Sequence, residues 1–164
     1  MKSVVPVLAV AAAIAVLAAA VQAAGPGRVG NVYYEDLFTN TNCVGSLFFC
    51  QNYSNTPTPT DAYVRVKHVA CEISIQNNGV LYRAQLQAWN GPPASNSSLI
   101  LKQFAVGIPT QSLATGSLNY YTIDSETNFL AGPGRYLVLN LQGSGGAITS
   151  SGVCGITGDL VPPQ

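Results

Sequence analysis

His68 is the only histidine in the chain, so any Ser-His-Asp or Cys-His mechanism would have to use it. The sequence has no Gly-x-Ser-x-Gly segment that would present a nucleophilic serine. The four cysteines form an even set, which favours disulfides over a catalytic thiol. We therefore predict that His68 is an ordinary strand residue and that the chain has no catalytic residue.

The acidic side chains are the second group of candidate catalytic residues, because two carboxylates that flank a glycosidic bond can catalyse its hydrolysis. The candidates are Glu35, Asp36, Asp61, Glu72, Asp124, Glu126 and Asp159. Their positions in the sequence do not fix a pair, and secreted hydrolases are usually larger than this chain. A small secreted hydrolase is therefore the third of three functional hypotheses, behind two non-catalytic ones.

Asp124, Glu126 and Asn128 place three oxygen-bearing side chains at alternate positions, an arrangement that Ca²⁺ can use. The segment is not an EF-hand, because the twelfth position of such a loop would be Arg135 instead of glutamate. A solvated strand end explains the pattern more simply. We predict no metal site and no cofactor, with these three residues as the calcium alternative.

The cysteines predict two disulfides, Cys43–Cys50 closing a local loop and Cys71–Cys154 joining distant strands. Zinc is the rival interpretation, but the chain has no Cys-x2-Cys spacing and only one histidine. The disulfide interpretation requires an oxidising compartment, either periplasmic or extracellular.

The N-terminal segment agrees with that compartment. Lys2 precedes an apolar run that ends in Val21-Gln22-Ala23, which predicts a signal peptide over residues 1–23. A retained membrane anchor is the alternative, but the run is mostly alanine and no basic cluster follows it. Residues 24–164 are then one domain, with no stable membrane insertion after cleavage.

The surface of that domain is expected to carry few charges. Charged residues make up 9% of the chain, against about 25% in a typical soluble domain. Without a basic field, nucleic acid is excluded as a partner. Asn, Gln, Ser, Thr and Gly supply the polarity instead, which suits contact with carbohydrate or self-assembly, because neither has to desolvate many ions.

The clearest structural signal is a predicted β-hairpin over residues 69–89, with Asn78-Gly79 in a tight turn. In this register His68 pairs with Trp89, and Glu72 lies diagonal to Arg83, where an ion pair is expected. Side chains alternate between faces. The predicted inner face is Val69, Cys71, Ile73, Ile75, Tyr82, Ala84, Leu86 and Ala88; the outer face is His68, Ala70, Glu72, Ser74, Arg83, Gln85, Gln87 and Trp89.

The rest of the chain predicts seven to nine short strands with no helix, hence an antiparallel β-sandwich or jelly roll. Val64 and Val66 alternate out of phase with Val69. Either a β-bulge near Lys67-His68 corrects the phase, or the second face is covered there. Residues 107–116 are expected to be a loop, residues 118–123 a strand, and Ala131-Gly132-Pro133-Gly134 a turn.

The predicted outer face of the hairpin is the candidate ligand site. A tryptophan beside amides resembles a sugar-binding platform in composition, where the ring stacks on a pyranose and amides meet its hydroxyls. The residues are Trp89, Gln87, Gln85, Arg83, Glu72 and His68. The alternative is that this face is covered and Trp89 belongs to the core.

The sequence thus predicts an exported, non-catalytic sandwich that binds a carbohydrate or another ligand at or outside the cell envelope. The alternative is a structural subunit that assembles with itself or with another envelope or extracellular protein.

Overall fold

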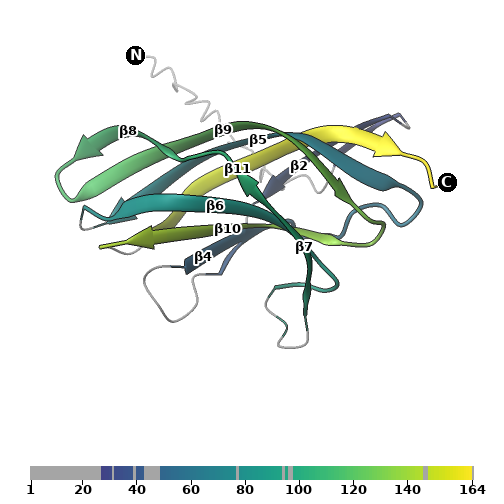
Figure 1. Ribbon diagram of the computed structural model, residues 1–164, viewed down its shortest axis with the longest axis horizontal. Helices are drawn as coiled ribbons and strands as arrows, with labels where there is room; N and C mark the ends of the chain where they lie inside the picture. The colour runs from purple at the N-terminus through teal and green to yellow at the C-terminus, as the bar shows by residue number, and fades with distance from the viewer. Residues whose placement is uncertain are drawn as a thin grey trace, which may run out of the picture.

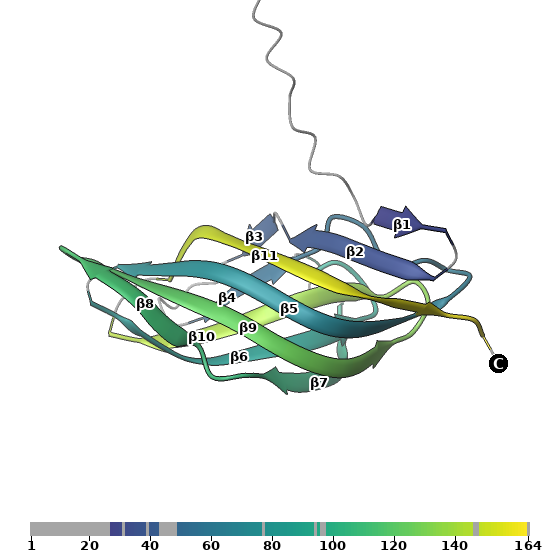
Figure 2. The same ribbon diagram turned by 90° about the horizontal axis from the view of Figure 1, so that it is seen from above.

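The computed structural model describes residues 27–30, 32–38, 40–42, 49–76, 78–93, 95, 98–145 and 148–163. In these ranges, eleven strands form two antiparallel sheets packed face to face, which confirms the predicted sandwich. Figure 1 shows the two layers one above the other, and in Figure 2 strands β9, β5 and β11 lie over β10 and β6. The predicted signal peptide and Cys43, and with it the Cys43–Cys50 bridge, lie outside the described residues.

The six-stranded sheet has the strand order β1-β2-β11-β5-β9-β8. Its strands are β1 (Gly27–Val29), β2 (Tyr33–Phe38), β11 (Ile148–Val161), β5 (Tyr63–Gln76), β9 (Leu118–Ala131) and β8 (Thr110–Thr115). The five-stranded sheet has the order β3-β4-β10-β6-β7. Its strands are β3 (Asn40–Asn42), β4 (Phe49–Tyr53), β10 (Tyr136–Ser144), β6 (Val80–Trp89) and β7 (Ile100–Val106).

The strands are more numerous than predicted, and two local predictions were wrong. The segment 107–116 contains β8, which pairs with β9 at the sheet edge although its side chains are exposed and show no buried face. Strand β9 continues beyond the predicted end at Ile123 to Ala131, and the predicted turn at residues 131–134 follows it. No helix in the described part of the chain is long and apolar enough to cross a membrane.

The predicted hairpin over 69–89 was also wrong. Strand β5 pairs with β9 and β11 in one sheet, whereas β6 pairs with β10 and β7 in the other. The chain therefore crosses from one sheet to the other between Gln76 and Val80. As a result His68 does not pair with Trp89, and Glu72 and Arg83 lie on opposite outer surfaces of the sandwich.

The turn at Asn78-Gly79 does exist, but it joins two layers. Asn78 has a φ of 57°, and the Gly79 amide donates to the Gln76 carbonyl at 3.1 Å. The Gly79 carbonyl accepts hydrogen bonds from the Asn119 side-chain amide at 3.0 Å and from the Tyr121 hydroxyl at 3.3 Å. Strand β9 therefore holds the crossing point in place.

The predicted phase correction near Lys67 is a β-bulge. On β9, Val66 pairs with Phe129 and His68 with Glu126, which leaves Lys67 out of the register. The register of β5 against β11 shifts at the same point, between Thr157 and Gly158. Gly158 has to be a glycine there, because a Cβ would collide with the Arg65 carbonyl. The bulge puts Val64, Val66 and Val69 all inside the sandwich.

The core lies between the sheets and contains the predicted inner residues of both strands except Tyr82. Cys71 and Cys154 are directly opposite each other on β5 and β11 and form the predicted disulfide. It joins neighbouring strands of one sheet, and it is consistent with an oxidising, non-cytoplasmic setting.

One carboxyl group lies among these core residues. Asp36 on β2 is only 6% exposed and shares the inner face with Tyr34 and Phe38. Its Oδ2 accepts a hydrogen bond from the Tyr34 hydroxyl at 3.3 Å, and its Oδ1 has no hydrogen-bond partner. Burial is the largest cause that raises the pKa of Asp36 from 3.8 to about 7.

Asp36 should make the protein less stable as the pH rises through 7. A carboxyl whose folded pKa exceeds its unfolded value contributes stability below the unfolded pKa and loses it on ionisation in the fold. We expect the free energy of unfolding to fall by about 2 kcal/mol between pH 5 and pH 8 because of this group. Urea unfolding at both pH values measures the change.

The Asp36→Asn variant is the control, because an amide at this position cannot ionise. Its stability should be flatter across the same window than that of the wild type. Asp61 does not interfere, because the hydrogen bond from Arg28 lowers its pKa and keeps it ionised throughout the window. An equal pH dependence in wild type and variant would contradict the assignment.

Candidate functional site

On the outer face of the six-stranded sheet, His68 of β5 lies against Asp124 of β9. The Nε2 atom of His68 lies 2.6 Å from Oδ1 of Asp124. The strand register places Ala70 of β5 between Asp124 of β9 and Gly155 of β11, and Gly155 is followed by Leu37 of β2. Two neighbouring central strands therefore carry very small side chains at this point.

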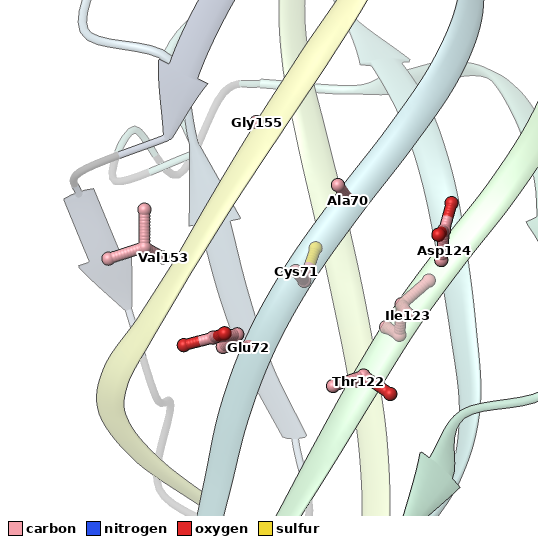
Figure 3. Close-up of a pocket in the computed structure, with 8 residues that line it drawn as sticks. All are labelled: Ala70, Cys71, Glu72, Thr122, Ile123, Asp124, Val153 and Gly155. Atoms are coloured by element: carbon pink, nitrogen blue, oxygen red, sulfur yellow. The ribbon is translucent and has the colours of Figure 1, made fainter. Parts of the chain in front are cut away.

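This deficit of side chains leaves a shallow trough. A hollow of about 410 Å³ and one of about 300 Å³ share Ala70 and Gly155, and a Cβ at Gly155 would meet no atom within 4 Å. Figure 3 shows the first hollow, with Glu72 and Val153 on one side of Ala70 and Asp124 on the other. Glu35 and His68 line the second hollow.

The trough is charged and open to solvent. A neutral ligand placed there would have to strip water from carboxylates, which is costly without new hydrogen bonds. No group of three or more metal-binding side chains occurs within the described ranges. Of the calcium candidates, Asp124 is engaged with His68, while Glu126 and Asn128 stand exposed along β9.

Charged residues are unequally divided between the two sheets. The strands of the six-stranded sheet carry Arg28, Glu35, Asp36, Arg65, Lys67, Glu72, Asp124, Glu126 and Asp159, and those of the five-stranded sheet carry Arg83 and Lys102. Lys102 reaches across to the other sheet, donating to the Leu130 carbonyl at 3.0 Å with its Nζ 5.0 Å from the Phe129 ring centroid. Arg83 is then the one charged residue on the outer face of the five-stranded sheet within the described strands.

Amide and aromatic side chains cover this surface, on which Arg83 is the one charged residue of the described strands; we call it the amide face. Its residues are Phe49, Gln51 and Tyr53 of β4; Tyr136, Val138, Asn140 and Gln142 of β10; Tyr82, Arg83, Gln85, Gln87 and Trp89 of β6; and Gln103 and Ala105 of β7. The register aligns Gln51, Asn140 and Gln85 in one row across three neighbouring strands. Gln142 and Arg83 continue the next row from Phe49.

The side-chain amides of the central row differ from most amides in the hydrogen bonds that they make. No side-chain hydrogen bond joins Gln51, Gln85 or Asn140 to another residue in the part of the chain that the structure describes. Gln85 is only 6% exposed, whereas Gln51 and Asn140 are partly exposed. A partly exposed amide without an internal hydrogen bond can donate to and accept from a molecule that lies on the face, and Gln51 and Asn140 meet this condition.

Two exposed aromatic residues stand at one end of the amide face. Phe49 is 45% exposed, and Tyr82 is 53% exposed because it lies in a bulge of β6 opposite Gln142 and Gly143. Tyr82 was predicted to point inward. Leu81 and Ala84 on either side of the bulge are buried, so Tyr82 and Arg83 both face outward. Sequence reasoning missed Phe49 and Tyr82, and no sequence signal marks this bulge.

Trp89 behaves differently from the predicted platform. It lies on the amide face but is only 8% exposed, and its Nε1 donates to Oε1 of Gln87 at 2.9 Å. The indole N–H therefore already uses the side-chain oxygen of Gln87 as its acceptor. The ring itself offers little exposed surface on which a sugar could stack. This placement agrees with the alternative that Trp89 is a structural residue.

The six predicted site residues are thus divided between two surfaces. Trp89, Gln87, Gln85 and Arg83 lie together along β6 on the amide face. Glu72 and His68 lie on the outer face of the six-stranded sheet, beside the trough. A scan against protein-family models, a search of curated proteins and a search of solved structures gave no match to this chain.

Proposed function

We propose that this protein is an exported, non-catalytic module that binds a carbohydrate on its amide face. The observation that carries the proposal is the row of Gln51, Asn140 and Gln85, whose side chains make no internal hydrogen bonds on a nearly uncharged surface. Amides both donate and accept hydrogen bonds, as sugar hydroxyls do. Binding there desolvates no carboxylate, in contrast to the trough.

Export is part of the proposal and rests on two features. The Cys71–Cys154 disulfide fits an oxidising compartment. The apolar segment before Ala23 has the pattern of a cleaved signal. A module of this kind would meet its glycan at or outside the cell envelope.

Replacing the amides of the central row should weaken binding without unfolding the protein. We expect the double variant Gln51→Ala/Asn140→Ala to bind a neutral glycan at least about tenfold more weakly, since each lost hydrogen bond is worth about 1 kcal/mol. The probes are neutral glucans, xylans and mannans, tested by calorimetry and by retention on the insoluble polymers.

The matched control removes one glutamine and one asparagine from the other sheet. Gln76→Ala/Asn128→Ala takes away two exposed amides that are outside the amide face. This variant should bind like the wild type. Equal losses in both double variants, or no binding by the wild type to any glycan in the panel, would overturn the proposal.

Self-assembly is the second candidate, and edge strand β7 favours it. Ile100, Leu101 and Phe104 on this strand are about half exposed, as is Leu99 just before it. An apolar edge strand offers unpaired backbone groups to a neighbouring chain. Sizing of the mature protein separates the two candidates, because a monomer favours glycan binding and filaments favour assembly.

A further inference from the structure

The two exposed aromatic residues of the amide face lie on strands separated by one other strand. Phe49 of β4 and Arg83 of β6 both align with Gln142 of the intervening β10, and Tyr82 is next to Arg83. Adjacent strands are about 4.8 Å apart, which puts the two aromatic positions roughly 10 Å from each other across the strands. The row of Gln51, Asn140 and Gln85 runs parallel to this line, two residues further along each strand.

From this geometry we infer that the ligand is an extended, neutral β-1,4-linked glycan that crosses the strands at right angles. The inference rests on the proposed function and adds the class and direction of the glycan. One ring of the chain stacks on Phe49, and the second ring beyond it stacks on Tyr82. The partly exposed amides of Gln51 and Asn140 meet the hydroxyls along one side of the glycan.

The chemistry of such a chain fits the spacing of the strands. In an extended β-1,4-linked glycan, successive rings are turned over, so every second ring presents the same face. A pyranose ring advances the chain by about one inter-strand distance. Rings two apart therefore coincide with positions two strands apart, here β4 and β6.

The absence of acidic groups from this face determines which glycans fit. Arg83 is its one charged residue in the described strands, and it stands at one end of the line. A uronic acid polymer would place carboxylates along the whole row of amides without cationic partners. A neutral backbone leaves no charge unpaired.

The length dependence of binding tests the inference. The probes are a disaccharide and a tetrasaccharide from each of β-1,4-linked glucose, xylose and mannose, titrated by calorimetry. For one of these series, the wild type should bind the tetrasaccharide at least about tenfold more tightly than the disaccharide, because only the longer chain covers both rings. Phe49→Ala and Tyr82→Ala should each abolish that gain.

Each single variant should still bind the disaccharide within about twofold of the wild type, because one aromatic position remains. Tyr120→Ala, which removes an exposed tyrosine from the other sheet, should leave the gain intact. Both site residues are exposed, so unchanged melting temperatures exclude misfolding as the cause.

Three outcomes overturn the inference. If the wild type binds both lengths equally, or if the gain survives in either variant, the crossing geometry is wrong while glycan binding stands. If no neutral glycan of any length or linkage binds, the proposed function fails together with it.

Discussion

Replacing Cys71 with serine is expected to lower the free energy of unfolding by about 4 kcal/mol, a large fraction of the stability of an average domain. The disulfide joins residues 83 positions apart. In the chain-entropy model its loss releases a long loop in the unfolded state, which favours unfolding. Denaturant unfolding under oxidising conditions measures the change.

The partner cysteine supplies the control for this experiment. Cys154→Ser should cost about as much as Cys71→Ser, and the double variant should cost no more than either, because one bond is lost in every case. Stabilities within about 1 kcal/mol of the wild type would contradict the expected effect of the bridge.

Truncating Trp89 to alanine is expected to cost about 3 kcal/mol of stability. The indole is almost completely buried, so its removal leaves a cavity, and Gln87 loses the donor that satisfies its Oε1. The tryptophan emission of the wild type should be blue-shifted and resistant to quenchers. Thermal and denaturant unfolding of the variant give the energetic cost.

Trp89→Phe separates the two contributions. This variant keeps an aromatic ring but has no N–H, so it should lose about 1 kcal/mol from the hydrogen bond and less from packing. A red-shifted wild-type emission together with a negligible cost for Trp89→Ala would mean that the ring is open to solvent, contrary to its placement here.

The inner-face residues of β5 could be predicted well from the sequence, because they depend only on alternation along one strand. Val69, Cys71, Ile73 and Ile75 are all buried, as the period of two requires. The break in phase before Val69 left two explanations open, and the register with β9 shows that the bulge at Lys67 is the correct one. Strand β8 escaped prediction because a fully exposed edge strand has no buried face to produce alternation.

The partners of β5 and β6 could not be predicted from the same pattern. A hairpin places two apolar faces on the same side of one sheet, whereas a crossing between sheets turns them toward each other. Both arrangements bury the same residues, and a Gly79 turn permits either. The choice between the two arrangements depends on strands that are distant in sequence. Strand β5 pairs with β9 and β11, whereas β6 pairs with β10.

Only part of the candidate site could be predicted, because alternation gives the direction of side chains along one strand but not which strands are neighbours. The outward direction of Arg83, Gln85 and Gln87 followed from alternation along one strand. Their neighbours Gln51 and Asn140 depend on the pairing of β10 with β4 and β6, which alternation cannot reveal. The outward direction of Tyr82 could not be predicted either. It results from a bulge in β6, and the apolar pattern of that strand shows no break at this point.

The position of β11 has a consequence for how this protein is made. It follows all the other described strands in sequence, yet it lies inside the six-stranded sheet and separates β2 from β5. A nascent chain that still lacks Ile148–Val161 leaves the early strands of this sheet without their central neighbour. The two parts of this sheet can therefore join only after residues Ile148–Val161 have been synthesised and have left the ribosome.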